Sequence, residues 1–210
     1  AIILLGYPSS DACEYTPKAG STEASVSSSV RLADSGPGWL ELKISGCPHN
    51  AVIITLPYPS EARLEELLSK EADENLLQKA YSDKIGNIFK SLSVKFRDDT
   101  VNLAVAHIFV LGGSTSDSER TLQVGGAMTV SPDVLPEKAD YVALGHLHRP
   151  QQIKNAPCPA YYSGSPLAYS FSEVDYAKAV YIIDAEPGRE ADIKEIFLDC
   201  GKPLKCWIAE

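Results

Sequence analysis

The chain has 210 residues, of which 44% are hydrophobic and 22% are charged, and its formal net charge is −9. This composition is typical of a globular protein with one large or two small domains, and no apolar stretch has the length of a membrane span. The acidic charge argues against a general electrostatic nucleic-acid binder, but it leaves open an enzyme whose bound cations meet phosphates. Five cysteines without CxxC spacing predict reduced thiols in a cytoplasmic protein, although Cys200 and Cys206 could pair.

The first quarter of the chain alternates strand and loop signals. Residues 1–6 are apolar and predict a buried strand, whereas residues 7–30 are rich in Ser, Ala, Thr and Pro and predict a mobile loop. Residues 39–44 alternate apolar and polar positions, and residues 51–56 form a more buried run. We expect these two segments to pair as a hairpin, with His49 as a solvated histidine in the connecting turn.

A helical region follows over residues 60–97. Ser60 is a suitable N-cap, and apolar residues then recur at helical spacing. The periodic positions are Leu64, Leu67, Leu68, Leu76, Leu77, Ala80, Tyr81, Ile85, Ile88, Phe89 and Leu92. We expect one or two amphipathic helices that face the core, with a partner contact as the alternative.

Strands dominate the second half of the chain. Residues 101–106 and 141–144 predict buried strands, and residues 161–166 predict a compact turn. Late strands are expected at 179–183 and 192–198, joined by a hairpin at Pro187-Gly188. The fold class is therefore α/β (α+β), built on stacked sheets.

The most informative motif is Gly145-His146-Leu147-His148, which holds two of the four histidines and directly follows the strand 141–144. If the strand continues, side chains two residues apart lie on the same face. A turn would instead splay the two imidazoles toward two neighbouring metal ions. A glycine before paired imidazoles suggests a backbone pressed close to a metal or a phosphate. The alternative interpretation is a pair of surface or core histidines.

His107 also follows an apolar strand, as His146 does. If the two strands are neighbours in one sheet, three imidazoles converge at one edge of that sheet. Because buried unpaired imidazoles are costly, such a group is best explained by metal ligation or mutual hydrogen bonds. Imidazole suits zinc, manganese and iron, so three histidines could form a mononuclear zinc site.

Four segments together resemble the metallophosphoesterase (calcineurin-like) superfamily and, more narrowly, the bacterial SbcD nuclease family. In these proteins a histidine at a strand end is followed later by Gly-His-x-His. The resembling segments are residues 106–113, 118–126, 140–151 and 162–168.

The resemblance implies a role for each histidine. His107 and His146 would bind one metal ion and His148 the other, and the two ions, usually Mn²⁺ with Mg²⁺ as an alternative, would activate water for attack on a phosphodiester. Arg149 would lie next to the site and could meet a phosphate, although an exposed arginine is an equal alternative. Residues 163–166 would shape the turn beside the site.

The resemblance also implies motifs that this sequence lacks, namely Asp-x-His, Gly-Asp and Gly-Asn-His-Asp. We therefore interpret residues 1–210 as the C-terminal portion of a metallophosphoesterase nuclease domain, a partial β-sandwich with flanking helices. We expect this chain alone to be catalytically impaired.

The parent protein would be an exonuclease and endonuclease that cleaves DNA ends and hairpins in DNA repair and recombination. It would act as a homodimer, away from membranes, with an ATPase of the SbcC type. Two alternatives remain open, a metallophosphoesterase for small phosphoesters and a non-catalytic binding or scaffold subunit.

Overall fold

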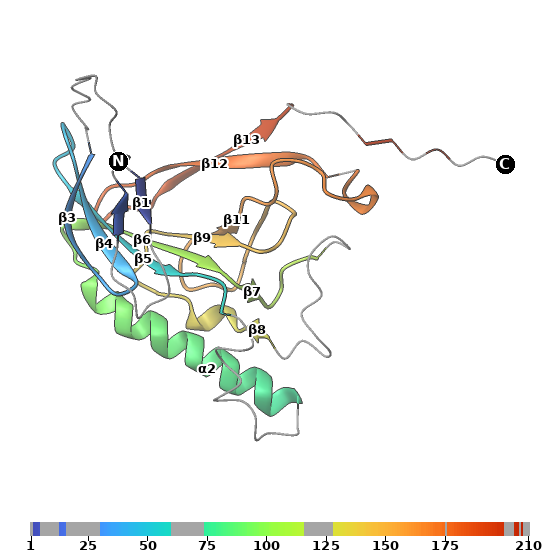
Figure 1. The fold of residues 1–210 in the computed structure, drawn as a ribbon, viewed down its shortest axis with the longest axis horizontal. Coiled ribbons are helices and arrows are strands. Elements are labelled where there is room, and N and C mark those ends of the chain that lie inside the picture. Colours follow the sequence, from blue (N-terminus) through green and yellow to red (C-terminus); the bar gives the residue numbers. More distant parts are fainter. Residues whose placement is uncertain are drawn as a thin grey trace.

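The computed structural model describes residues 2–4, 13–15, 30–59, 74–115, 128–174, 176–199, 204–205 and 207. Its centre is a seven-stranded mixed sheet in the order β10-β11-β9-β6-β5-β4-β3 (Figure 1). The four strands β11, β9, β6 and β5 run parallel to one another, whereas β4, β3 and β10 pair antiparallel to their neighbours. The strands of this sheet are β3 (Val30–Gly36), β4 (Trp39–Ile44), β5 (Asn50–Leu56), β6 (Thr100–His107), β9 (Tyr141–Gly145), β10 (Gln151–Gln152) and β11 (Ala160–Tyr162).

Three strand pairs and a long helix surround the central sheet. The pairs are β1 (Ile2–Leu4) with β2 (Cys13–Tyr15), β7 (Phe109–Val110) with β8 (Thr129–Val130), and β12 (Lys178–Asp184) with β13 (Asp192–Leu198). The helix α2 spans Glu74–Leu92, and short 3₁₀ turns follow at Ser93–Lys95, Pro132–Val134 and Phe171–Glu173. Among the described helices, none is long and apolar enough to cross a membrane.

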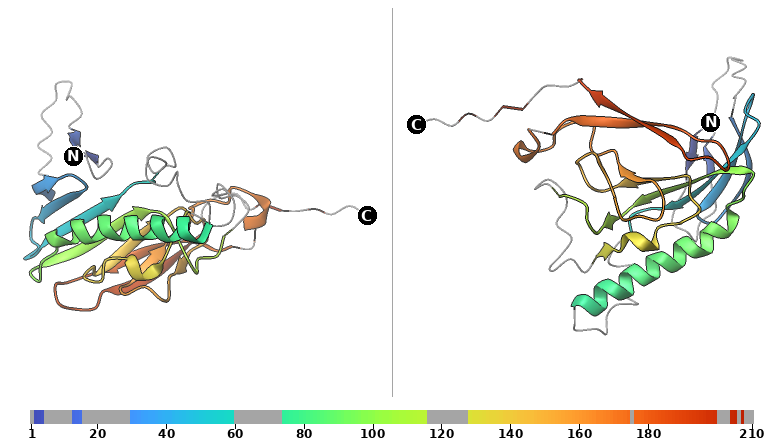
Figure 2. Two further views of the ribbon diagram at one scale, coloured as in Figure 1. Left: turned by 90° about the horizontal axis from the view of Figure 1, so that it is seen from below. Right: turned by 180° about the vertical axis from the view of Figure 1, so that it is seen from behind.

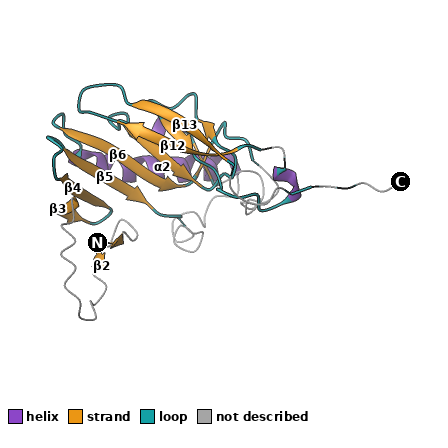
Figure 3. Ribbon diagram, turned by 90° about the horizontal axis from the view of Figure 1, so that it is seen from above, coloured by secondary structure: helices purple, strands orange, loops and turns teal. Residues whose placement is uncertain are grey.

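The elements form layers, with α2 along one face of the sheet and the β12–β13 hairpin across the other (Figures 1 and 2). Seen from above, the strands lie in front of α2 (Figure 3). On the helix side, residues in register such as Ile54, Ala104 and Val142 are fully buried in one apolar cluster with Ile85 and Phe89 of α2. Tyr161 of β11 contacts Tyr181 of β12 on the other side, with ring centroids 5.1 Å apart. The mixed α+β class is confirmed.

The strands with a clear apolar pattern were predicted correctly. β4 and β13 have the expected bounds, and β5, β6, β9 and β12 each extend the expected range by one or two residues. The predicted hairpin of β4 with β5 is antiparallel, and a second hairpin joins β12 and β13. The described part of the predicted helical region 60–97 contains α2, whereas residues 60–73, Ser60 included, lie outside the described residues.

In the N-terminal part, one prediction was wrong in part and one strand was missed. The expected loop 7–30 contains β2, which pairs antiparallel with β1, and Val30 already belongs to β3; its other residues lie outside the described residues. β3 gives no apolar alternation because it is an edge strand, mostly exposed and bonded to β4 alone. A register shift between Leu32 and Asp34 further obscures its pattern.

Two local predictions also need correction. Tyr161 and Tyr162, expected in a turn, end β11, where they pair in parallel with β9. Leu76, expected in the apolar stripe of the helix, is 52% exposed. It lies five residues before the buried Tyr81, and five helical residues rotate a side chain by about 140° away from the core-facing side.

Candidate metal centre

His107 and His146 meet at the carboxyl end of the parallel part of the sheet. β6 and β9 are neighbours in parallel, and His107, the last residue of β6, is in register with Gly145, the last residue of β9. The imidazole of the next residue, His146, lies 5.4 Å from that of His107 between ring centroids, with the rings nearly perpendicular. The expectation that these two strands are neighbours is confirmed.

The backbone around this pair is tightly constrained. A Cβ atom on Gly145 would lie 3.0 Å from Nδ1 of His107, so the glycine lets the imidazole pack against the backbone of β9. The sequence predicted a close approach at Gly145, and the group that approaches in the structure is this imidazole. His146 has a backbone φ of 115°, a left-handed value that residues with a Cβ atom rarely adopt. Strain of this kind persists where the surrounding structure enforces it, often at functional sites.

Aromatic rings enclose the two imidazoles. Tyr58, just after β5, lies edge-on to His107 and parallel to His146, with centroids 5.7 and 6.3 Å away. Phe109 of β7 lies 6.2 Å from His146. Burial lowers the pKa of His107 below its ordinary value, and the nearby His148 lowers it further. The imidazole of His107 therefore favours the neutral form, which is the form that binds metal ions.

His148 faces a different set of residues. Its Nδ1 atom lies 3.0 Å from Oε1 of Glu173, whose side chain is fully buried. The second carboxylate oxygen of Glu173 accepts a hydrogen bond from Nζ of Lys178 at 2.6 Å, and Lys178 also donates to Oγ of Ser165 at 2.8 Å. The two histidines of the motif thus differ in their contacts, since the ring of His146 lies against His107 whereas Nδ1 of His148 lies against Glu173.

The sequence reasoning did not identify Glu173, Lys178 or Tyr58. Ser170-Phe171-Ser172-Glu173 has the spacing of a capping box, which would have marked the turn at residues 171–173 but not the contact of its glutamate with a histidine 25 positions earlier.

The turn at residues 163–166, which the sequence predicted to lie beside the site, contacts the backbone of His148. Gly164 has φ of 77°, and a Cβ atom there would lie 2.5 Å from the carbonyl oxygen of His148. The backbone N–H of Ser165 donates to that same oxygen at 3.1 Å. A glycine is therefore required at this position by both conformation and space.

The donor set fits a divalent ion in part. The separation of the His107 and His146 rings is compatible with two imidazoles that share one ion. Among the described residues, however, no three His, Cys, Asp or Glu side chains lie close enough together to hold a metal ion. The described residues could therefore supply at most part of a coordination sphere. His49 lies before β5, at the opposite end of the sheet from His107, as expected for a turn histidine.

Arg149 lines a cavity of about 610 Å³ next to the motif. Its guanidinium group lies over the ring of Tyr176, 5.1 Å from the centroid. The charged residues that line the cavity are Arg149 and Lys154, and the other lining residues are apolar or neutral polar. Gln151 fixes one wall, because it accepts a hydrogen bond from the backbone of Ser114 and donates to the carbonyl oxygens of Ser114 and Arg149.

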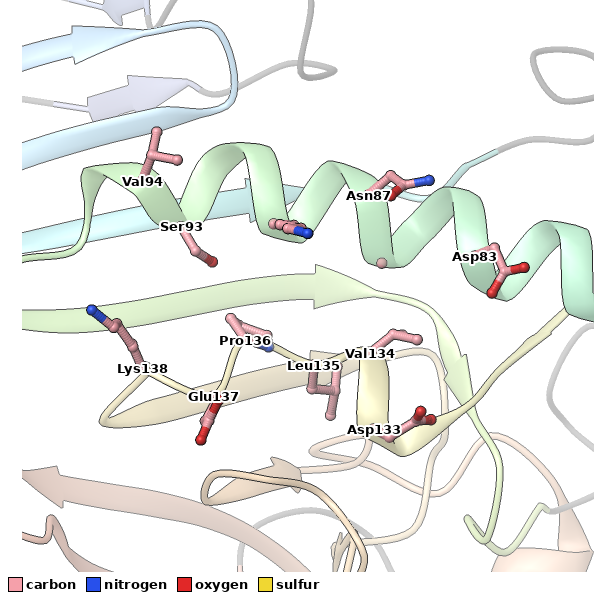
Figure 4. Close-up of a pocket in the computed structure, with 12 residues that line it drawn as sticks. Asp83, Asn87, Ser93, Val94, Asp133, Val134, Leu135, Pro136, Glu137 and Lys138 are labelled. Carbon is pink, nitrogen blue, oxygen red and sulfur yellow. The ribbon is translucent and has the colours of Figure 1, made fainter.

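A second groove, of about 780 Å³, runs between α2 and residues 133–138 (Figure 4). Its charged side chains are of both signs, for example Asp83 and Lys138, and none of the three histidines lines it. It is therefore separate from the candidate metal centre.

Comparisons with known proteins place the chain in a family. No protein-family model matches it. It is 57% identical over 154 residues to a Bacillus subtilis protein named as the SbcD subunit of the nuclease SbcCD, an alignment that covers 73% of this chain and 39% of that protein. A Staphylococcus epidermidis protein of the same name is 34% identical over 151 residues, which cover 72% of this chain and 37% of that protein. The chain thus belongs to the family of SbcD-type nuclease subunits and spans about two fifths of the length of the curated relatives that it matches.

Proposed function

We propose that this chain forms part of the metal centre of an SbcD-type nuclease subunit that hydrolyses phosphodiester bonds at DNA ends and hairpins in DNA repair and recombination. The observation that carries the proposal is the meeting of His107 and His146 at the ends of two neighbouring parallel strands. The identity to proteins named as the SbcD subunit of the nuclease SbcCD supports a nuclease over other phosphoesterases.

In this proposal the three histidines divide between two divalent ions, with Mn²⁺ as the first choice and Mg²⁺ as the alternative. His107 and His146 would hold one ion and His148 the other, in agreement with the different contacts of the two motif histidines. When bound, such ions polarise a phosphate and activate water. The aromatic rings of Tyr58 and Phe109 would exclude bulk water from the His146 side.

Arg149 is proposed to bind a DNA phosphate together with Lys154. The two cations share one cavity, and none of the described residues that line it is acidic, so an anion there meets the positive charges of Arg149 and Lys154 in an otherwise acidic protein. The proposed partner is an SbcC-type ATPase, as the name of the relatives suggests, and the proposed assembly is a homodimer.

Manganese binding by the purified chain tests the metal proposal. We expect isothermal titration calorimetry to detect Mn²⁺ binding that weakens at least tenfold in His107→Ala and in His146→Ala. His49→Ala is the matched control, because His49 lies at the other end of the sheet. Equal affinity in all four proteins, or no binding at all, would refute a metal centre built on these histidines.

The type of reaction requires an assay on the full-length parent. Cleavage of hairpin-ended DNA, measured beside hydrolysis of a nitrophenyl phosphate, separates a nuclease from a phosphomonoesterase. A non-catalytic binding subunit is the second candidate, favoured by the incomplete ligand group among the described residues. Manganese-independent DNA binding without cleavage would support that candidate instead.

A further inference from the structure

We propose that Glu173 is a positioning residue, which fixes the tautomer and direction of the His148 imidazole so that Nε2 faces the metal centre. This inference rests on the proposed metal-binding role of His148. The carboxylate of Glu173 is an obligate acceptor, so the Nδ1 atom of His148, 3.0 Å away, must carry the hydrogen. A neutral imidazole protonated on Nδ1 has its lone pair on Nε2, the atom that a metal can bind.

The carboxylate of Glu173 is itself held in place. Its side chain has no solvent exposure, and its Oε2 atom accepts from Nζ of Lys178 at 2.6 Å and from the backbone N–H of Tyr169 at 3.3 Å. Oγ of Ser165, which donates to the carbonyl oxygen of Leu167 at 2.8 Å, lies 3.4 Å from the same atom. With Oε2 satisfied in this way, Oε1 remains directed at His148. The carboxylate is therefore held where it can orient His148.

The same group of residues also holds the backbone of His148. The carbonyl oxygen of His148 accepts from the N–H of Ser165 at 3.1 Å, and Nζ of Lys178 lies 3.5 Å from it. Lys178 and Ser165 thus contact both the backbone of His148 and the carboxylate that holds its ring. Ring and backbone are fixed by one buried network, as expected for a ligand whose orientation matters.

The competing explanation is a structural ion pair between Glu173 and Lys178 with His148 as a bystander. The two explanations differ for Glu173→Gln. The ammonium group of Lys178 only donates, so the glutamine would turn its carbonyl oxygen to Lys178 and its NH₂ group to His148. His148 would then have to accept at Nδ1 and carry its hydrogen on Nε2. We therefore expect the tautomer of His148 to invert.

The experiment is a long-range ¹H–¹⁵N correlation spectrum of the histidine-labelled chain without metal, at about pH 8, where ordinary imidazoles are neutral. We expect His148 to be protonated on Nδ1 in the wild-type chain and on Nε2 in Glu173→Gln. The double variant with Lys178→Met should restore the Nδ1 form, because the glutamine can then offer its oxygen to His148. Glu41→Gln is the matched control, a buried carboxylate paired with Arg97 at 2.8 Å.

Mn²⁺ affinity provides the second measurement. We expect a loss of about 10- to 100-fold at the His148 ion in Glu173→Gln, a partial recovery in the double variant and no change in Glu41→Gln. An Nε2-protonated His148 in the wild-type chain, or the same tautomer in wild type and Glu173→Gln, would overturn the positioning role even if Mn²⁺ binds. The predicted tautomers without any Mn²⁺ binding would instead uphold the positioning role and refute the proposed metal centre.

Discussion

The left-handed backbone of His146 predicts that glycine is more stable than alanine at this position, the reverse of the usual order. In most positions Gly is less stable than Ala by about 0.5–1 kcal/mol, because it loses more backbone freedom on folding. At φ of 115° a residue with a Cβ pays a strain of about 1–3 kcal/mol that glycine avoids. The difference leaves His146→Gly more stable than His146→Ala by about 1 kcal/mol, and both variants lack the imidazole, so its contacts cancel in the comparison.

Urea unfolding of the two variants, followed by circular dichroism, measures this difference. The corresponding shift of Tm is about 2–4 °C for a chain of this size. His49→Gly and His49→Ala form the control pair, because His49 has no left-handed backbone and Ala should be the more stable there. If His146→Ala proved as stable as His146→Gly, the strain attributed to His146 would not exist.

Three further predictions concern a partly buried ion pair, a close backbone contact and a buried thiol. Arg97 holds the pKa of Glu41 below its ordinary value of 4.5, so Glu41→Gln should lower the free energy of unfolding by about 1–3 kcal/mol at neutral pH. This difference in the free energy of unfolding should persist above the ordinary pKa of glutamate and disappear as the pH falls through the lowered pKa. Urea unfolding at neutral and at acidic pH measures it, and a difference that does not change with pH would show that the pair contributes nothing. Gly164→Ala should cost about 2–4 kcal/mol, visible as a lower Tm, because its Cβ meets the carbonyl of His148 at 2.5 Å; an unchanged Tm contradicts the close approach. Burial raises the pKa of Cys158 to about 12, so iodoacetamide at about pH 8 should alkylate it only after urea unfolds the chain, and rapid labelling of the folded chain would argue against this burial.

The strands that position the histidines could be predicted because buried strands are rich in apolar residues. β5, β6 and β9 lie in the middle of the sheet and each places several side chains in the apolar core, so they read as apolar runs. β3 and β11 could not be recognised in the same way. β3 is an exposed edge strand, and β11 has only three residues, too few for a periodic pattern.

The residues of the candidate site also differ in whether the sequence reveals them. His107 and His146 were found because each follows an apolar strand, and the register of β6 with β9 then brings them together. Glu173 and Lys178 carry no comparable signal, since one sits in a short 3₁₀ turn and the other at the start of a strand. Their burial follows only from the tertiary fold, which places both side chains against His148.

The direction of the two motif histidines depends on one backbone angle. With regular strand geometry, His146 and His148 would lie on the same face and compete for the same space. The left-handed φ of His146 ends β9 at Gly145 and sends its imidazole toward His107, while the chain turns and His148 meets Glu173. The strained residue thus lies between the two parts of the motif that have different contacts. If the proposed centre holds two ions, a histidine is needed at position 146 for its imidazole, which gives a physical reason for a non-glycine residue at an angle that favours glycine.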